Sequence, residues 1–348
     1  MRSDDDARSR ARGALYGLAI GDALGMPTQM LSRREIGRRW GGLLHGFEPA
    51  PEGHPIAAGM PAGAVTDDTE QAVLLGRLLV RGNGAVDPRE LAEALVAWEQ
   101  DMAARGSQDL LGPSTKHAVA VLLAGAPLDE AGSSGATNGA AMRIAPVGIA
   151  AALDLPDPAP ASAPATQLSL STLVDRVVAA SMVTHNTGLA LAGAAAVAAA
   201  VSAGISGAQV AGATAIATAA ARLAAGRGHW VAGADVAARI WWATALVAGR
   251  DQADAAGLIY TLVGTSLATQ ESVPAAFAVL AAVPDDPWQA CLLAASLGGD
   301  CDTIAAMAGA VAGACHGVGA FPPAALAVID AQNLGLTALA DDLYALRS

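Results

Sequence analysis

The chain has 348 residues, of which 53% are hydrophobic and only 3% aromatic, and its formal net charge is −12. Ala, Leu and Val must therefore fill the core, and Ala has the highest helix propensity of all residues. The negative charge argues against a nucleic-acid partner, because phosphate binding needs a basic surface. Three cysteines without C-x-x-C spacing, and a charged start of the chain without the apolar segment of a signal peptide, indicate a cytoplasmic protein.

Apolar residues recur at helical spacing through most of the chain. The first stripe, over residues 14–19, predicts a helix that ends near Gly21, and similar stripes predict helices around residues 73–78, 91–98 and 119–123. The C-terminal half indicates further helices separated by Gly and Pro. No convincing run alternates apolar and polar residues, so a major sheet is not expected. The sequence therefore predicts an all-α fold.

Three segments do not fit this pattern of amphipathic helices. Residues 41–63, with several Gly and Pro, predict a long loop, and the Pro/Ala/Ser-rich residues 155–169 predict a flexible surface insertion. Residues 187–221 carry no charge, but they consist largely of Ala, Gly, Ser and Thr and are interrupted near Gly204 and Gly207. We interpret them as two buried helices and expect no membrane association.

Two acidic clusters stand far apart in the sequence, each before an apolar helix. The first is Thr66-Asp67-Asp68-Thr69 and the second is Asp300-Cys301-Asp302-Thr303, which follows two glycines. Either could cap a helix, but one Asp suffices for a cap. Surplus carboxylates in an apolar chain are costly to bury unless a cation balances them. Hard oxygen ligands select Mg²⁺, Mn²⁺ or Ca²⁺, so the two clusters together predict a site for two divalent ions and hydrolytic chemistry.

Three further features allow two interpretations each. Asp22, between glycines, is either a hydrogen-bond acceptor behind the metal site or a turn aspartate. His185 is either a substrate or proton-transfer residue or a structural histidine at a helix start. The glycine-rich residues 132–143 either cradle a phosphate or form an ordinary loop.

Five motifs in order resemble those of the ADP-ribosylglycohydrolase family, which includes the dinitrogenase reductase-activating glycohydrolase. They are GDALG at 21–25, TDDT at 66–69, NGAAMR at 138–143, THNTG at 184–188 and GGDCDT at 298–303. The resemblance spans about the whole chain. It implies one domain over residues 1–348, folded as a compact orthogonal helical bundle with a central binuclear metal cleft.

The resemblance also implies roles for individual residues. Two Mg²⁺ ions, or alternatively Mn²⁺, are expected as cofactors, and an ADP-ribosylated protein or small ribosylated molecule is expected as substrate, with no obligate protein partner. Asp302 is expected to bridge the ions, and Asp302 or Asp67 to accept the proton. The implied metal ligands are Thr66, Asp67, Asp68, Asp300, Asp302 and Thr303, and the implied substrate-binding residues are Asn138, Gly139, Ala140, Met142 and His185.

Two positions depart from the family pattern. Cys301 stands where the family usually has Thr, and Gln29 stands where it commonly has a catalytic or gating Glu. Gln29 cannot act as a base or neutralise a cation, but it can hydrogen-bond to water or ribose. Besides cleavage of an ADP-ribosyl adduct, the sequence therefore leaves open hydrolysis of a smaller N-riboside or nucleoside-like glycoside, or binding of ADP-ribose without catalysis.

Overall fold

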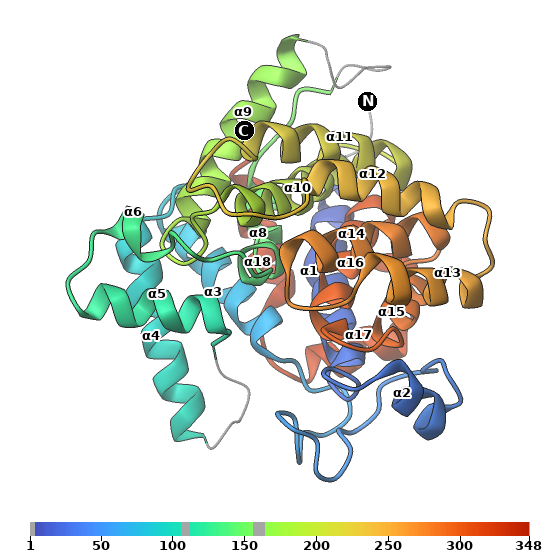
Figure 1. The fold of residues 1–348 in the computed structure, drawn as a ribbon. Helices are drawn as coiled ribbons and strands as arrows, with labels where there is room; N and C mark the ends of the chain where they lie inside the picture. Colours follow the sequence, from blue (N-terminus) through green and yellow to red (C-terminus); the bar gives the residue numbers. More distant parts are fainter. Residues whose placement is uncertain (1–3, 106–110, 156–163, 348) are drawn as a thin grey trace.

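In the computed structural model, which describes residues 4–105, 111–155 and 164–347, the protein is built from helices (Figure 1). The described residues form no strand, only isolated bridges of Thr137 with Ala268 and of Thr187 with His229. The predicted all-α class is confirmed. The elements are α1 (Asp4–Gly25), α2 (Arg33–Trp40), α3 (Asp67–Arg81), α4 (Pro88–Ala104), α5 (Pro113–Leu123), α6 (Leu128–Ala131), α7 (Gly139–Met142), α8 (Ala145–Ala150), α9 (Pro164–Ser181), α10 (Gly188–Ile205), α11 (Val210–Ala224), α12 (Val236–Val247), α13 (Gln252–Leu258), the π-helix η1 (Ile259–Val263), α14 (Thr269–Ala282), α15 (Pro287–Ala295), α16 (Cys301–His316), the 3₁₀ helix η2 (Val318–Ala320), α17 (Pro323–Asp330) and α18 (Leu336–Ala345).

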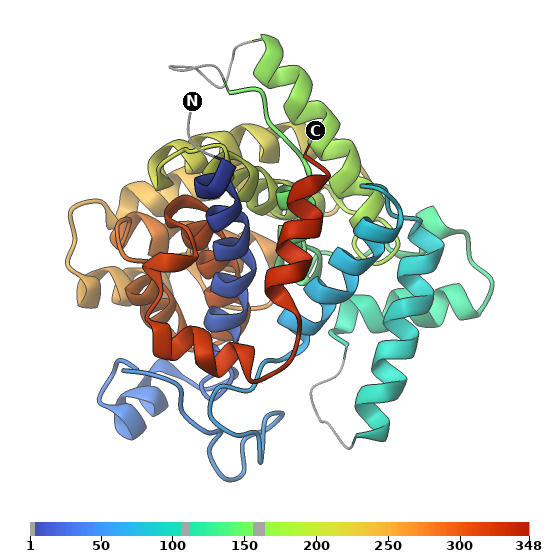
Figure 2. The same ribbon diagram turned by 180° about the vertical axis from the view of Figure 1, so that it is seen from behind.

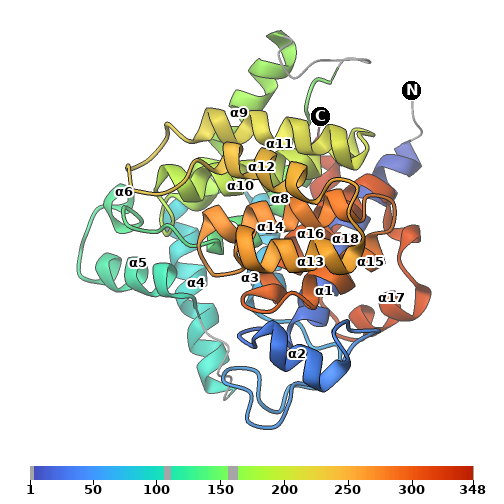
Figure 3. The ribbon, with the colours of Figure 1, turned by 45° about the vertical axis from the view of Figure 1, so that its right-hand side comes forward.

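Two predicted boundaries differ from the structure. Helix α1 continues to Gly25, so Asp22 lies inside a helix and not in a turn. Helix α9 begins at Pro164, so the C-terminal end of the predicted insertion is helical, while residues 156–163 lie outside the described residues. Proline is tolerated in a first helical turn because an N–H there has no helical acceptor. The loop over residues 41–63 is confirmed, and Figure 3 shows it beside α2 at the lower edge.

Helices α1 and α16 run antiparallel in direct backbone contact. A Cβ atom on Gly17 would lie 2.0 Å from the carbonyl oxygen of Gly309, and one on Gly21 would lie 2.0 Å from that of Ala305. Only glycine permits this approach. At the end of the contact a Cβ on Gly25 would lie 2.2 Å from the Cα of Asp302. The packing therefore lays the C-terminal end of α1 against the acidic start of α16.

Helix α10 passes through the core. It is long and apolar enough to cross a membrane, but 89% of this 18-residue stretch is buried by the rest of the fold. It packs against α8, α9, α11 and α16, and its small side chains allow these close contacts. Helix α11 differs from the expectation of full burial, since only the face that includes Ala213, Ile216 and Ala220 is buried. The uncharged stretch thus forms one core helix and one helix with an exposed face.

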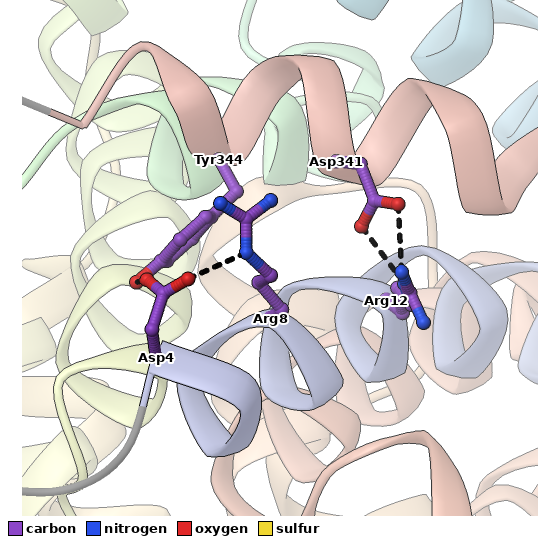
Figure 4. A network of polar contacts seen from close by, with 5 residues as sticks. All are labelled: Asp4, Arg8, Arg12, Asp341 and Tyr344. Carbon is purple, nitrogen blue, oxygen red and sulfur yellow. Dashed lines mark hydrogen bonds and ion pairs between the residues drawn. The ribbon is translucent and has the colours of Figure 1, made fainter.

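The last helix, α18, lies beside the first, as Figure 2 shows from behind. Arg12 donates to both carboxylate oxygens of Asp341, at 2.8 and 2.7 Å (Figure 4). The hydroxyl of Tyr344 donates to Asp4 at 2.9 Å, and Arg8 donates to the other oxygen of that carboxylate at 2.7 Å. These contacts anchor the C-terminal helix to α1, the helix that also carries Asp22.

Candidate active site

The two acidic clusters meet in space at the starts of α3 and α16. The hydroxyl of Thr303 donates to Asp68 Oδ2 at 3.2 Å, although the two residues are 235 positions apart. Burial raises the pKa of Asp68 well above its ordinary value, and the charges of Asp302 and Asp67 raise it further. The structure therefore brings together the two clusters that the sequence analysis grouped, in an environment that disfavours the charged form of Asp68.

Neither cluster caps its own helix through the side chain at the cap position. Thr66 and Asp300 occupy the N-cap positions of α3 and α16, but neither side chain accepts a backbone N–H of its helix. Ordinary caps occur elsewhere in the chain: Asp235 accepts from the N–H of Ala238 at 2.7 Å. Side-chain capping at these two positions, the simple alternative to a functional role, is therefore wrong.

Asp22 of α1 takes over the capping of α3. Its Oδ2 accepts the backbone N–H groups of Thr66 and Thr69, at 2.9 and 3.1 Å, and the two threonine hydroxyls donate to the same carboxylate. Burial raises the pKa of Asp22 to about 6, and these hydrogen bonds oppose the shift. Of the two interpretations, the structure supports the hydrogen-bond acceptor behind the acidic cluster.

A cavity of about 260 Å³ opens beside the acidic cluster. The carboxylates of Asp67, Asp300 and Asp302 line the cavity. Lys116 also lines it, and its ammonium nitrogen lies 3.8 Å from the carboxylate of Glu99. The sequence-predicted residues Thr66, Asp68, Ala140 and His185 are buried and do not line the cavity. Those that do line it are Gln29, Asp67, Asn138, Gly139, Met142, Asp300, Asp302 and Thr303.

Asn138 connects the glycine-rich segment to the acidic cluster. Its side-chain amide donates to Asp300 at 2.5 Å and to the hydroxyl of Ser272 at 3.0 Å. Burial raises the pKa of Asp300 to about 6, and the hydrogen bond from Asn138 opposes that shift. Asn138 thus orients a carboxylate at the cavity wall.

The glycines of this segment serve close packing. A Cβ on Gly132 would lie 2.3 Å from the carbonyl oxygen of Met182, and one on Gly135 would lie 2.2 Å from that of Thr184. These two glycines let the segment approach protein backbone, which supports the ordinary-loop interpretation for this part of residues 132–143.

A buried hydrogen-bond network that the sequence analysis missed supports Asp67. Gln71 donates to Asp67 at 3.0 Å, and Arg143 donates to the side-chain oxygen of Gln71 at 3.0 Å and to the Thr184 hydroxyl at 2.6 Å. Arg143 is fully buried, and burial lowers the pKa of its guanidinium to about 10. The available signal was an arginine directly before the apolar residues 144–151.

The same network places His185 behind the cavity wall. His185 Nδ1 lies 2.8 Å from the Thr184 hydroxyl, and Nε2 lies 3.0 Å from the Thr137 hydroxyl. The Thr137 hydroxyl donates its hydrogen to Ser114 at 2.9 Å, so it accepts from Nε2, which places the imidazole proton on Nε2. Burial, with the charge of Arg143, holds the pKa of His185 well below its ordinary value. His185 therefore differs from the expected substrate-facing position: it is neutral and lies beneath Gly139, whose added Cβ would be 2.9 Å from Cε1.

The residues present fit divalent cations by charge and by donor type. Asp68 Oδ1 is buried, and within the described part of the chain no donor lies within hydrogen-bonding distance of it. Carboxylates and threonine hydroxyls are the hard oxygen donors that Mg²⁺ and Mn²⁺ prefer. Among the described residues, no three Asp, Glu, His or Cys side chains already form a group that could hold an ion. The fit therefore depends on the donor set and the buried negative charge.

Comparison with known proteins identifies the family. The model of the ADP-ribosylglycohydrolase family matches residues 3–348. The chain belongs to this family. It is therefore a glycosidic-bond hydrolase, and the resemblance seen in the five motifs is confirmed over nearly the whole chain.

Individual relatives agree with this assignment. The chain is 35% identical to the uncharacterized protein YegU of Escherichia coli (strain K12), over 93% of this chain and 92% of that protein. It is 31% identical to the ADP-ribosyl-[dinitrogen reductase] glycohydrolase of Rhodospirillum rubrum, over 40% of this chain and 44% of that enzyme. A solved ADP-ribosylglycohydrolase-related protein complex matches 99% of this chain and 100% of its own, with 25% identity and a TM-score of 0.65.

Proposed function

We propose that the protein uses two divalent cations to hydrolyse the glycosidic bond between ADP-ribose and a protein side chain or small acceptor. One observation carries the proposal: two helix starts place surplus carboxylates in one buried cluster, and neither helix is capped by its own side chain there. Mg²⁺ is the first candidate and Mn²⁺ the second. The residues that would hold the ions are Thr66, Asp67, Asp68, Asp300, Asp302 and Thr303.

Residues of the chain itself bind the substrate and accept the proton. When bound, the cations supply a Lewis acid that polarises ribose oxygens and lowers the pKa of water. Asp67 and Asp302 line the cavity and are the candidates to accept the proton that the attacking water loses. Asn138, Gly139 and Met142 line the same cavity and contact the substrate. His185 supports Gly139 from behind and does not transfer a proton to the substrate.

A smaller N-riboside is the second candidate substrate. The cavity of about 260 Å³ lies below the range of roughly 300–1,000 Å³ that is usual for ligand pockets. A nucleoside-like glycoside is smaller than an ADP-ribosyl adduct and needs less space. Neither candidate requires a nucleic acid, a membrane or an obligate protein partner, and the three buried free cysteines favour a reducing, cytoplasmic location.

The test is a substrate panel read by mass spectrometry. The purified full chain is loaded with Mg²⁺ or Mn²⁺ and incubated with Arg-, Ser- and other O-linked ADP-ribosyl peptides and with nucleosides. We expect release of ADP-ribose that stops when EDTA is added and falls by at least about 100-fold in Asp302→Asn, because even residues that only support metal ligands change activity by about 10–100-fold. Asp286→Asn, at the cap of α15, is the matched control and keeps full activity.

The possible outcomes separate the candidates. Absence of ADP-ribose release across the panel, with both metals tested, would contradict the main proposal. Free ribose from nucleosides alone would favour the smaller glycoside. Tight binding of ADP-ribose without turnover would indicate a binding protein.

A further inference from the structure

Lys116 is the only lysine in the chain, and its side chain lines the cavity beside the acidic cluster. Asp67, Asp300 and Asp302 line the same cavity, and within the described part of the chain no other Lys, Arg or His side chain does so. The divalent cations of the proposed function would balance these carboxylates. Lys116 is therefore the positive charge that the protein itself presents to a ligand in this cavity.

Lys116 lies near the start of α5, which packs against the segment expected to contact the substrate. The Ser114 hydroxyl accepts a hydrogen bond from Thr137 at 2.9 Å, and a Cβ on Gly139 would lie 3.8 Å from the hydroxyl oxygen of Thr115. Thr115 is itself buried. These contacts fix the start of α5 beside Gly139, so Lys116 comes from the part of the cavity wall where the substrate is expected.

Glu99 of α4 holds Lys116 only loosely. Its Oε1 lies 3.8 Å from Lys116 Nζ, whereas hydrogen bonds between charged nitrogen and oxygen groups measure about 2.7–2.9 Å. The Lys116 side chain is also 49% exposed, and an ion pair in contact with water contributes little to stability. The ammonium group therefore keeps hydrogen-bond donors for an anion in the cavity.

We propose, on the basis of the proposed hydrolase function, that Lys116 binds a phosphate group of the substrate and makes the site select phosphate-bearing ribosides over neutral nucleosides. An ADP-ribosyl adduct carries a negatively charged diphosphate, which a cavity lined by carboxylates repels. Lys116 offsets this repulsion and donates hydrogen bonds to phosphate oxygens. A neutral nucleoside has no charge to pair with the ammonium group. Lys116 thus favours the first of the two candidate substrates.

The first experiment measures Kd by calorimetry for ADP-ribose and for adenosine, with the full chain loaded with Mg²⁺. We expect ADP-ribose to bind at least about 10-fold more tightly than adenosine, and Lys116→Gln to reduce this ratio by about 10-fold, because charge-assisted hydrogen bonds are lost. Lys116→Arg keeps the charge and retains the preference. Added salt weakens ADP-ribose binding to the wild-type protein more than binding to Lys116→Gln.

A second experiment observes the Lys116 amine directly, since no other lysine is present. Reductive methylation with ¹³C-formaldehyde keeps the positive charge of the amine. Its NMR signal is assigned by its absence in Lys116→Arg, where only the methylated N-terminal amine remains. We expect ADP-ribose to shift this signal and adenosine to leave it in place. A purely structural role of Lys116 would not produce a shift that depends on phosphate.

A matched control removes the same charge elsewhere. Arg222→Gln, exposed on α11, leaves both Kd values unchanged. Failure of the wild-type protein to bind ADP-ribose overturns the inference, and so does a Lys116→Gln variant that keeps its affinity for ADP-ribose or loses affinity for both ligands equally.

The inference and the hydrolase proposal can fail separately. Binding that follows the expected order, without release of ADP-ribose from any adduct, supports the role of Lys116 and contradicts only the hydrolase proposal. Release of ADP-ribose with a KM that Lys116→Gln does not raise supports the hydrolase and overturns the role of Lys116.

Discussion

The start of α3 is held by side-chain hydrogen bonds, whereas the start of α16 is held by close backbone packing together with the hydrogen bond from Asn138 to Asp300. At α3, Asp22 accepts the free N–H groups and Gln71 orients Asp67. At α16, Gly25 lies against the backbone of Asp302, and the preceding Gly298 and Gly299 adopt φ of 90° and 76°. Two halves of one acidic cluster are therefore positioned by different forces. We expect the α3 half to respond to charge and hydrogen bonding, and the α16 half to respond to added volume.

Gly21→Ala should have the largest effect, because it adds volume where α1 meets α16. Its methyl carbon would lie 2.0 Å from the carbonyl oxygen of Ala305, and backbone cannot move aside as a side chain can. We expect the free energy of unfolding to fall by at least about 3 kcal/mol in urea titrations. Gly37→Ala, in α2 with nothing within 4 Å of its Cβ, should be neutral or slightly stabilising. Equal stabilities would show that the helices can separate without cost.

The pH dependence of stability tests the charge response. The pKa values of Asp22 and Asp300 are raised from 3.8 to about 6, so in the metal-free protein the folded state holds protons that the unfolded chain releases. Stability should therefore fall as pH rises from about 4 to about 7, by on the order of 2 kcal/mol for each of the two groups. Saturating Mg²⁺ should reduce the fall, because a cation stabilises the ionised carboxylates. Urea titrations across this window provide the measurement, and a rise in metal-free stability would contradict the expectation.

Asp22→Ala isolates the hydrogen bonds that hold α3. It leaves the N–H groups of Thr66 and Thr69 without their acceptor, and we expect a loss of about 2 kcal/mol in the Mg²⁺-loaded protein. Asp235→Ala removes an ordinary exposed cap from α12 and should cost about 1 kcal/mol. Thermal and urea unfolding of both variants give the comparison. A gain in stability for Asp22→Ala would mean that charge repulsion at the cluster outweighs the hydrogen bonds.

Thr184→Val should have the smallest effect, since it removes a single hydroxyl from the network behind Asp67. Arg143 loses one acceptor and His185 Nδ1 loses its donor, at a cost of about 1 kcal/mol. The preference of His185 for the Nε2–H tautomer should weaken, which imidazole nitrogen shifts in NMR spectra report. Thr172→Val, at an exposed position of α9, is the control. An unchanged tautomer would show that Thr184 does not orient the imidazole.

Much of the architecture could be predicted from the sequence because helical periodicity is local. The stripes at residues 73–78, 91–98 and 119–123 lie in α3, α4 and α5, and the loop over residues 41–63 is present. The end of α1 and the start of α9 could not be predicted correctly from the sequence. Glycines in α1 resemble a stop signal until their contact with α16 is known, and Pro164 resembles a loop residue although it begins a helix.

The sequence by itself determined the helical class, the family and the pairing of the two acidic clusters. These follow from local periodicity, motif order and the cost of surplus buried carboxylates. Only the tertiary structure decided that Asp22 of α1, and not the N-cap residue Thr66, supplies the side-chain acceptor at the start of α3. Only the tertiary structure also showed that Arg143 donates to both Gln71 and Thr184. The physical reason is that a free N–H at a helix start can donate to any acceptor close in space. Which residue comes close depends on the packing of α1 against α16, where glycines distant in sequence meet.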